Sequence, residues 1–268
     1  MHALHGGFPA LRRGLFPLLL IPLLLAVWQV LASVVGETTL ASPYMAFVEL
    51  VDGLSQGWLL GSLLVTMHAT TVGFGLAAVS GVWAGSLLGV SRFWREVWEP
   101  LLLAVYAIPK VTLFPLFLFF LGFGLMVESA FGFFHGFFPV AIFTMNAVAA
   151  MPATYMKVAR VTNLNRWQTF RMVMLPATLP HVVNGLRFGF SLTFLGVVLA
   201  EMFASPGGSG KLIASAVAIN DTARMLALVV PLVVIALLIN GGFLWLHGRL
   251  SPQRAFRQGA TGTLVGGS

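Results

Sequence analysis

The sequence predicts an all-α, polytopic membrane protein with about six transmembrane helices. The first observation is composition: 58% of the 268 residues are hydrophobic and only 9% are charged, whereas a soluble domain carries roughly a quarter charged residues. The second is that about six apolar stretches are long enough to cross a bilayer core of about 30 Å, which takes about 20 helical residues. We therefore expect lipid to surround most of the outer surface.

The distribution of charge favours a membrane protein over other classes. The net charge of +7 would indicate a nucleic-acid partner only if the bases formed a stripe on a soluble face. Instead, Lys and Arg fall in short clusters between apolar runs, which is how membrane topology is encoded, so we expect no nucleic-acid partner. The absence of Cys excludes a disulfide framework and a thiolate metal site.

The expected spans follow one another with short connections. They run over about 14–35, 59–90, 97–121, 130–150, 177–203 and 224–247. The first follows Arg12-Arg13 and, with a weak cleavage signature at Val30-Leu31-Ala32, resembles a secretory signal. Because this stretch is long for such a signal and five more spans follow, we expect an uncleaved first helix.

Basic residues are concentrated on one side of the predicted bundle. One side carries Arg12, Arg13, Arg92, Arg95, Lys157, Arg160, Arg166, Arg171, Arg249, Arg254 and Arg257. The other carries Glu37, Glu49, Asp52, Glu128 and Asp221, with only Lys211 and Arg224 as bases. Because short loops rich in Lys and Arg stay in the cytoplasm, both termini are expected there. We therefore predict a cytoplasmic N-terminus at 1–13, a single transmembrane domain at 14–250 and a flexible cytoplasmic tail at 251–268.

Small residues and prolines mark particular spans. Gly81, Gly85 and Gly89 lie four apart on one face of the second span, where another backbone can approach closely. Prolines interrupt the third and fourth spans, at Pro109, Pro115 and Pro139. A proline kinks a helix where protein or a cavity lies alongside, so these spans either line a path or simply pack around the kinks.

The chain shows no catalytic machinery of its own. Ser205 to Leu212 resembles a phosphate-binding loop, but Ser205 and Leu212 stand where that pattern requires Gly and Ser or Thr. Three dispersed histidines, His68, His135 and His181, lack metal-ligand spacing. We therefore predict no catalytic residue, no metal site and no cofactor bound by this chain, and any energy source must be another subunit.

The longest predicted cytoplasmic connection, at about 152–175, is organised as a helical hairpin. Pro152 suits the first turn of a short helix, and Asn163 favours the left-handed conformation that stops one. Asn165 with Gln168 imitates a capping box, so a second helix begins there and is expected to end near Leu175-Pro176. Such a hairpin is stiff enough to transmit a rigid-body displacement, and Ala159 offers a partner close approach. From physics alone, a basic helix lying on anionic lipid is an equally good interpretation.

A resemblance favours the docking interpretation. The stretch from Lys157 to Trp167, continued by Val173 to Pro176, resembles the "EAA" coupling motif of binding-protein-dependent ABC importer permeases. That motif has Glu-Ala-Ala, a Gly after three residues, and Ile-x-Leu-Pro after nine more. Ala159 matches the second Ala, Val173 the Ile, and Leu175-Pro176 the final pair. The resemblance implies that the residues coupling this chain to an ATPase are Lys157, Val158, Ala159, Arg160, Asn163, Asn165, Arg166, Leu175 and Pro176. Lys157 replaces the Glu, Val158 the first Ala and Asn163 the Gly.

Other stretches are similar to the nitrate/sulfonate/taurine branch of these permeases. They are Ile108 to Leu116, Gly122 to Gly124, Leu179 to Arg187 and Gly196 to Met202. The resemblance implies a type I importer in the bacterial inner membrane, with a second permease copy, two cytoplasmic ATPases carrying ATP and Mg²⁺, and an extracytoplasmic substrate-binding protein. A homodimer is the natural expectation, and a heterodimer with a sister permease stays open.

Charges inside the spans are candidates for the translocation path. Lys110, Arg187 and Glu201 fall within or at the ends of apolar runs, where an ionisable group usually faces a partner or a water-filled cavity. The two cations suit a small anionic solute. Alternatively, Lys110 extends its amine to the membrane surface and Arg187 pairs with a carboxylate or a helix end.

Two other functions stay open at this point. A self-sufficient, ion-coupled secondary transporter usually carries internal repeats around midplane polar sites, and no repeat is evident here. A membrane scaffold or an intramembrane enzyme is the third class, and the lack of paired catalytic residues argues against the enzyme.

Overall fold

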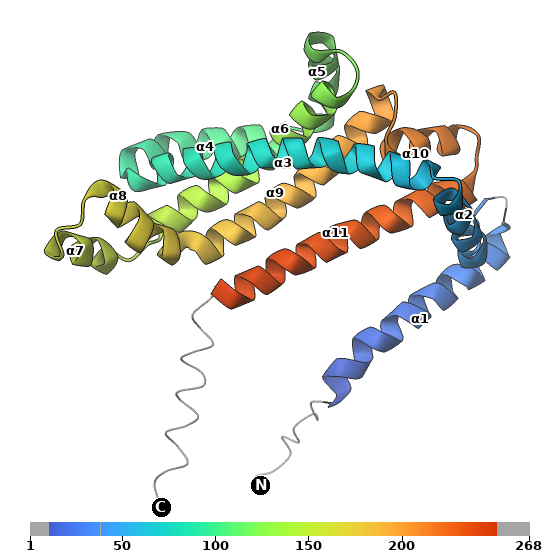
Figure 1. Ribbon diagram of the computed structural model, residues 1–268, viewed down its shortest axis with the longest axis horizontal. Coiled ribbons are helices and arrows are strands. Elements are labelled where there is room, and N and C mark those ends of the chain that lie inside the picture. Colours follow the sequence, from blue (N-terminus) through green and yellow to red (C-terminus); the bar gives the residue numbers. More distant parts are fainter. Residues whose placement is uncertain (1–10, 38, 251–268) are drawn as a thin grey trace, which may run out of the picture. The chain divides into compact units, whose positions relative to one another are not determined.

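The computed structural model describes residues 11–37 and 39–250, and every regular element in those ranges is a helix (Figure 1). The predicted tail 251–268, with Arg254 and Arg257, and the first ten residues lie outside the described residues. The elements are α1 (Leu11–Val35), α2 (Pro43–Ser55), α3 (Trp58–Val90), α4 (Arg92–Ala107), the 3₁₀ helix η1 (Lys110–Leu113), α5 (Phe114–Leu121), α6 (Leu125–Ala149), α7 (Ala153–Val161), α8 (Arg166–Thr169), the π-helix η2 (Phe170–Met174), α9 (Leu175–Ala204), α10 (Ser209–Ala218) and α11 (Thr222–Leu250).

Four described helices are long and apolar enough to cross a membrane: α3, α6, the continuous segment Trp167–Ala204, and α11. The segments Arg92–Ala107 and Lys110–Leu121 make a fifth span if they count as one. In α1, the apolar part Pro22–Val35 belongs to the shorter class. The all-α membrane class is confirmed with four to five candidate spans, while six spans and the cytoplasmic position of both termini stay predictions.

The predicted third span, 97–121, is not one helix. Its two halves are bent by 83°, because Pro109 pushes the preceding Ile108 into an extended conformation (ψ 135°). Pro115, which we expected to interrupt a helix, instead lies in the first turn of α5, where its missing N–H is not needed. In contrast, α6 continues through Pro139.

Contacts divide the chain into two compact units. Of the described residues, those up to Leu60 form the first unit together with Leu212–Pro231, and Gly61–Lys211 forms the second together with those from Leu232 to Leu250. In the first unit, the connection after α1 is fixed by the Trp28 indole, which donates to the Ala41 carbonyl at 3.0 Å. The Ala41 amide in turn donates to Thr222 Oγ1 at 3.1 Å, so residues far apart in sequence hold one another.

The second unit is built on α6, which packs between glycine-bearing faces of α3 and α9. A Cβ on Gly81 would lie 2.8 Å from the Val140 side chain, and one on Gly89 would lie 2.6 Å from the Met145 carbonyl oxygen. Gly196 of α9 approaches the His135 ring in the same way, at 2.9 Å. The predicted close approach along α3 is confirmed, and the physical reason is that helices in lipid gain stability through close backbone packing.

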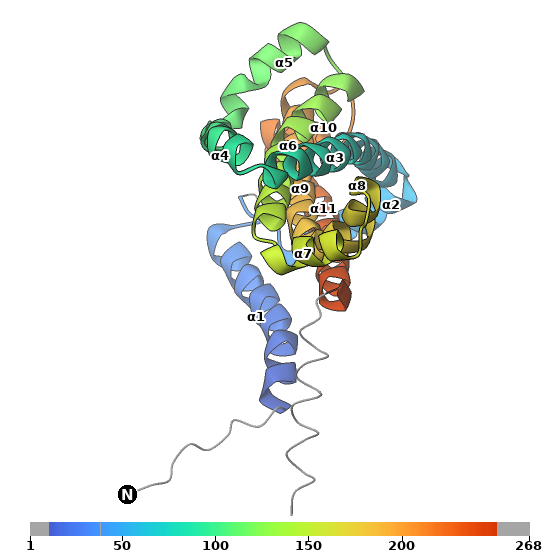
Figure 2. The same ribbon diagram turned by 90° about the vertical axis from the view of Figure 1, so that its left-hand side faces the viewer.

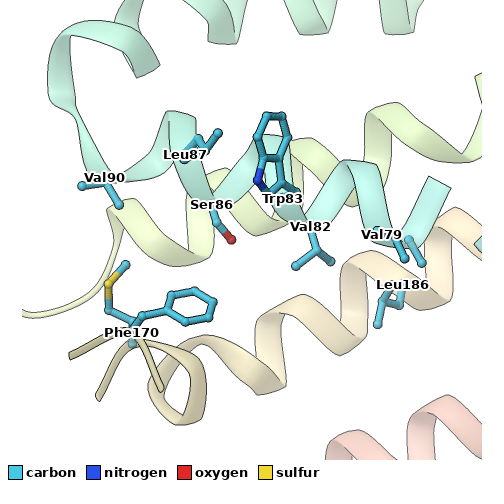
Figure 3. Close-up of a pocket in the computed structure, with 10 residues that line it drawn as sticks. Val79, Val82, Trp83, Ser86, Leu87, Val90, Phe170 and Leu186 are labelled. Carbon is cyan, nitrogen blue, oxygen red and sulfur yellow. The ribbon is translucent and has the colours of Figure 1, made fainter. Parts of the chain in front are cut away.

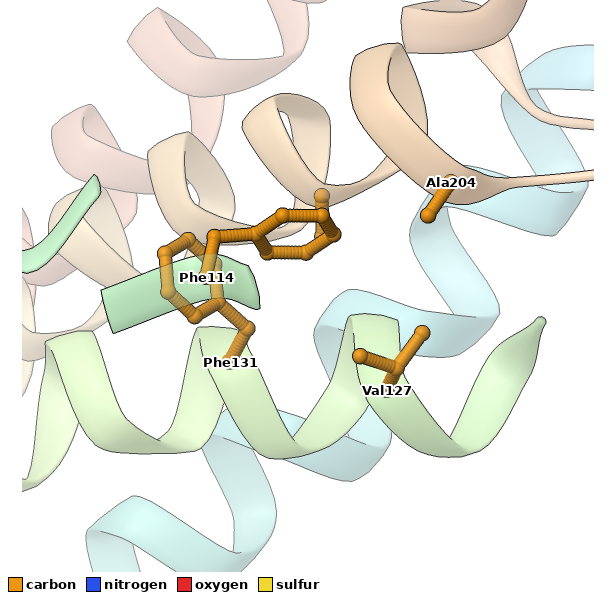
Figure 4. Packing of buried hydrophobic residues seen from close by; sticks show 5 residues of the cluster. Phe114, Val127, Phe131 and Ala204 are labelled. Carbon is orange, nitrogen blue, oxygen red and sulfur yellow. The ribbon is translucent and has the colours of Figure 1, made fainter. Parts of the chain in front are cut away.

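A hydrophobic cluster positions the short helix α5 on this unit. Phe114 packs against Val127, Phe131, Ala200 and Ala204, all of them buried (Figure 4). The Phe114 and Phe131 ring centroids are 5.1 Å apart in an edge-on arrangement, which is a favourable geometry for aromatic pairs. The chain after the break at Pro109 is therefore docked on α6 and α9.

Candidate functional site

The first helix of the hairpin at 152–175, the stop after it and the start of the second helix are as the sequence predicts. Helix α7 begins after Pro152, and Asn163 adopts the left-handed conformation (φ 50°) beyond its end. The next helix opens with a reciprocal capping box. The backbone N–H of Gln168 donates to Asn165 Oδ1 at 2.8 Å, and the backbone N–H of Asn165 donates to Gln168 Oε1 at 2.9 Å. These bonds satisfy helix-end groups without help from the rest of the molecule.

The second hairpin helix does not end at Leu175-Pro176, as we expected it to. It continues through the π-helical turn η2 directly into α9, so that Trp167–Ala204 forms one helix of 38 residues. A proline removes a backbone donor and crowds the preceding turn, and a wider π turn just before Pro176 accommodates both effects. The hairpin is therefore joined to a membrane span without a flexible break.

The outer face of α7 is basic and partly apolar. Lys157 and Arg160 are exposed, as are Val158 (52%) and Val161 (82%). Ala159 is only 3% exposed, so our interpretation that it gives a partner close approach is wrong. It faces inward because the right-handed turn of α7 places it opposite Lys157 and Val161, and it allows α7 to pack within the hairpin.

A groove lies beside α7 where the hairpin meets α9. It has a volume of about 410 Å³ and is lined by Tyr155, Val158, Met172, Val173, Pro176, Ala177 and Pro180. Leu175 and Pro176 are both exposed, and α7 and α8 lie side by side at this end of α9 in both views (Figures 1 and 2). Apart from the buried Ala159, the motif positions whose side chains the structure describes are accessible. The side chain of Arg166 lies outside the described part of the structure.

Glu201 lies at the opposite end of α9, in a buried polar network. The side chain is fully buried, and its Oε2 accepts from Thr66 Oγ1 at 2.9 Å and from the Gly210 amide at 2.8 Å. The Ser209 amide donates to Thr66 Oγ1 at 2.9 Å. Here Glu201 anchors the α9–α10 connection to α3.

A second buried carboxylate holds the same connection. Glu128 of α6 is 1% exposed and accepts from Ser205 Oγ, and the Gly207 amide donates to that hydroxyl at 3.1 Å. Gly208 has a positive φ of 87°, and a Cβ on it would clash with the Glu201 carboxylate. The glycine-rich segment that imitates a phosphate-binding loop therefore directs a backbone amide at the chain's own carboxylate.

The structure does not gather the three path candidates into one cluster. Lys110 Nζ donates to the Tyr106 carbonyl at 2.9 Å and lies 4.3 Å from the Tyr106 ring centroid. Arg187 is half-buried on α9, with its guanidinium carbon 5.3 Å from the Phe188 ring centroid. Lys110, Arg187 and Glu201 have separate surroundings, and their role in a path stays a prediction.

The sequence pattern did not reveal Thr66 and Ser205 as partners of the buried carboxylates, nor Ser209 as a partner of Thr66. The available signal was a Glu inside an apolar run followed closely by Gly-rich sequence, since a buried carboxylate needs donors that backbone amides can supply. Within residues 11–37 and 39–250, no group of three or more His, Asp or Glu side chains lies close enough to hold a metal ion.

Comparisons with known proteins place these features in one family. Residues 77–255 match the sequence pattern of a protein family described as the binding-protein-dependent transport system inner membrane component. The protein named as an aliphatic sulfonates transport permease, SsuC, of Bacillus subtilis (strain 168) is 30% identical, over 92% of this chain and 91% of its own. The riboflavin transport system permease protein RibX of Chloroflexus aurantiacus is 31% identical, over 85% and 87%. The nitrate import permease protein NrtB of Synechococcus elongatus is 29% identical, over 76% and 77%.

A solved structure shares the fold. A chain from the MetNI methionine ABC transporter, in an inward-facing conformation, aligns with a TM-score of 0.60 at 22% identity. The alignment covers 72% of this chain and 97% of that chain.

Proposed function

This chain belongs to the family of binding-protein-dependent transport system inner membrane components, and from that membership we propose that its hairpin at 152–175 receives the movement of a cytoplasmic ATPase. The chain is an ABC importer permease subunit of the inner membrane, and ATP hydrolysis belongs to a separate subunit. The open questions are where force enters this chain, which solute crosses and which partners complete the transporter.

The observation that carries the coupling proposal is the unbroken helix from Trp167 to Ala204. At 1.5 Å per residue, 38 residues span about 57 Å, more than the thickness of a hydrocarbon core. The hairpin at one end is locked by its own caps, and the other end is fastened to α3 and α6 by Glu201 and by Ser205. A displacement of the hairpin would therefore move the α9–α10 connection as part of one body.

The surface of α7 supports docking on a soluble protein. Val158 and Val161 are exposed beside Lys157 and Arg160, and an apolar strip next to basic side chains is suited to a groove with an acidic rim. Lys157 stands where the family motif has a carboxylate, so the ion pairing at this position is reversed. We infer that the partner surface near Lys157 is acidic.

The proposed solute is small and anionic, comparable to nitrate, a sulfonate or taurine. Two of the relatives named above carry an anion in their names. Lys110 and Arg187 supply cations along the bundle. The proposed assembly contains two permease copies, two ATPase subunits and an extracytoplasmic binding protein, with this chain as a homodimer and both termini in the cytoplasm.

Purification of the tagged chain from its native membrane tests the coupling proposal. We expect a nucleotide-binding polypeptide to co-purify and to hydrolyse Mg-ATP, and we expect Val161→Glu to reduce its recovery at least tenfold. The matched control is Val217→Glu, which also adds a carboxylate at an exposed valine (55%) but on α10, and it should leave recovery unchanged. Equal recovery with both variants would refute docking on α7. Ion-driven uptake by liposomes holding this chain alone would instead support a secondary transporter.

A further inference from the structure

An apolar cleft runs along the half of α3 that leads into α4. It has a volume of about 590 Å³ and lies between α3 on one side and η2 with α9 on the other (Figure 3). Val79, Val82, Leu87 and Phe170 line it, and Ser86 supplies the only hydroxyl among the lining residues. Nothing in the coupling mechanism uses this cleft.

The cleft ends at two arginines. A second hollow of about 340 Å³ contains Arg92 and Arg95 in its lining and shares Val90 and Met174 with the apolar cleft. Arg92 Nε donates to Glu96 at 2.7 Å, which leaves the other guanidinium N–H groups of both arginines as donors. The two hollows therefore adjoin, and together we call them the trough, which is lined by apolar residues along α3 and by two arginines at one end.

The cationic end has the residue composition of a membrane surface. Phe93, Trp94 and Trp98 are all exposed beside the arginines, and Trp with Arg is typical of the boundary between hydrocarbon and headgroups. From Ala78 to Val90, the lining residues of α3 extend about 18 Å at 1.5 Å per residue. That length is close to one leaflet, about 15 Å, of the hydrocarbon core.

The lining and the length of the cleft indicate its occupant. Most of the lining side chains are aliphatic or aromatic, and they offer few hydrogen-bond partners. A cleft of this kind, about 18 Å long, suits an extended hydrocarbon chain.

We propose that this trough is a binding site for an anionic phospholipid. One acyl chain lies along Val79, Val82 and Phe170, and the phosphate is held by Arg92 and Arg95. Basic hollows between transmembrane helices recognise acidic lipid headgroups through such charges, and Arg binds phosphate in a bidentate manner. The lipid would connect α3 to η2, the turn that joins the hairpin to α9.

Native mass spectrometry of the full chain, purified in detergent, tests this proposal. The probes are dioleoylphosphatidylglycerol and dioleoylphosphatidylcholine, which have the same acyl chains and differ in charge. We expect the anionic lipid to be retained at least tenfold more. Arg92→Gln and Arg95→Gln should each reduce retention of the anionic lipid about fivefold, as expected for one basic residue at a membrane surface. Ser86→Trp should reduce retention of both lipids by obstructing the cleft.

Two controls separate this site from general charge and from misfolding. Arg249→Gln removes an exposed arginine from α11 and should leave the lipid preference unchanged. A phosphatidylglycerol with a photoreactive acyl chain, applied to the unaltered chain, should label residues within 78–90 or 170–186. Equal retention of the two lipids, an unaltered preference in the arginine variants, or labelling confined to other segments would overturn the proposal.

Discussion

Two connections flank α9, and they are held in opposite ways. The α9–α10 connection is fastened to the bundle by hydrogen bonds from Thr66, Gly210 and Ser205 to the buried carboxylates of Glu201 and Glu128, and the bonds from Thr66 and Ser205 join residues far apart in sequence. The hairpin of α7 and α8 is held by bonds between residues three or four apart, such as Asn165 with Gln168. The α9–α10 connection is held by contacts with buried residues of the bundle, whereas the hairpin is held by contacts within its own segment.

The difference between the two connections separates the expected effects on the stability of the fold from the expected effects on coupling. Damage to the α9–α10 connection leaves buried polar groups without partners and should destabilise the whole second unit. Damage to the hairpin exposes only local groups to water and should change the free energy of unfolding little. If the hairpin transmits force, however, its loosening should remove coupling while the fold survives.

The largest expected effect is at Gly208. Gly208→Val should lower the free energy of unfolding by roughly 3 kcal/mol, because a β-branched residue is strained at φ 87° and its Cβ would clash with the Glu201 carboxylate. Thermal unfolding in detergent, followed by tryptophan fluorescence, measures the change. Gly207→Ala is the control, since a Cβ there meets open space. Equal losses in the two variants would show that the tight contact with Glu201 is unimportant.

Replacing Glu201 itself tests the buried anchor. Glu201→Leu should lower the free energy of unfolding by about 2–3 kcal/mol, because the Gly210 amide loses its acceptor in a buried site. Glu201→Gln retains a carbonyl oxygen that can accept the same bonds and should recover at least half of the loss. The same unfolding assay applies, and a Gln variant as unstable as the Leu variant would contradict the acceptor role.

A smaller effect on stability, with a larger one on coupling, is expected at Asn163. Asn163→Val places a β-branched residue at φ 50°, which costs about 1–2 kcal/mol and disturbs the stop between α7 and α8. We expect ATP-driven uptake in proteoliposomes to fall at least tenfold with normal membrane insertion. Asn163→Gly tolerates this conformation and should retain uptake, so loss in both variants would point to a role for the Asn side chain instead.

The smallest expected effect is at the capping box. Asn165→Ala removes the acceptor of the Gln168 amide and should cost about 1 kcal/mol locally. Hydrogen exchange of that amide should become about fivefold faster, while the amides of α9 stay unchanged. Asn165→Asp keeps an acceptor and should retain protection. Faster exchange throughout α9 would mean that the hairpin and the span unfold together.

Most of the hairpin could be predicted from the sequence, but little of the hydrogen-bond network around Glu201 and Glu128 could. Pro152, Asn163 and Asn165 act on their own neighbours, so their effects follow from local chemistry and were predicted. The α6 contacts of Gly81, Gly85 and Gly89 were predicted as a close approach, but the partner helix was not. The end of the second hairpin helix at Pro176 was mispredicted, because a π turn before the proline allows the helix to continue.

By itself, the sequence determined the membrane class, the helical hairpin and the family, because hydropathy, capping and spacing are properties of neighbouring residues. Only the tertiary structure decided that Ala159 faces inward, that Ile108 and Pro109 break a span by 83°, and that Glu201 fastens a glycine-rich loop. The last of these depends on groups brought together from distant segments, such as Thr66 with Glu201. Such pairings follow from the packing of whole helices, which no local pattern specifies.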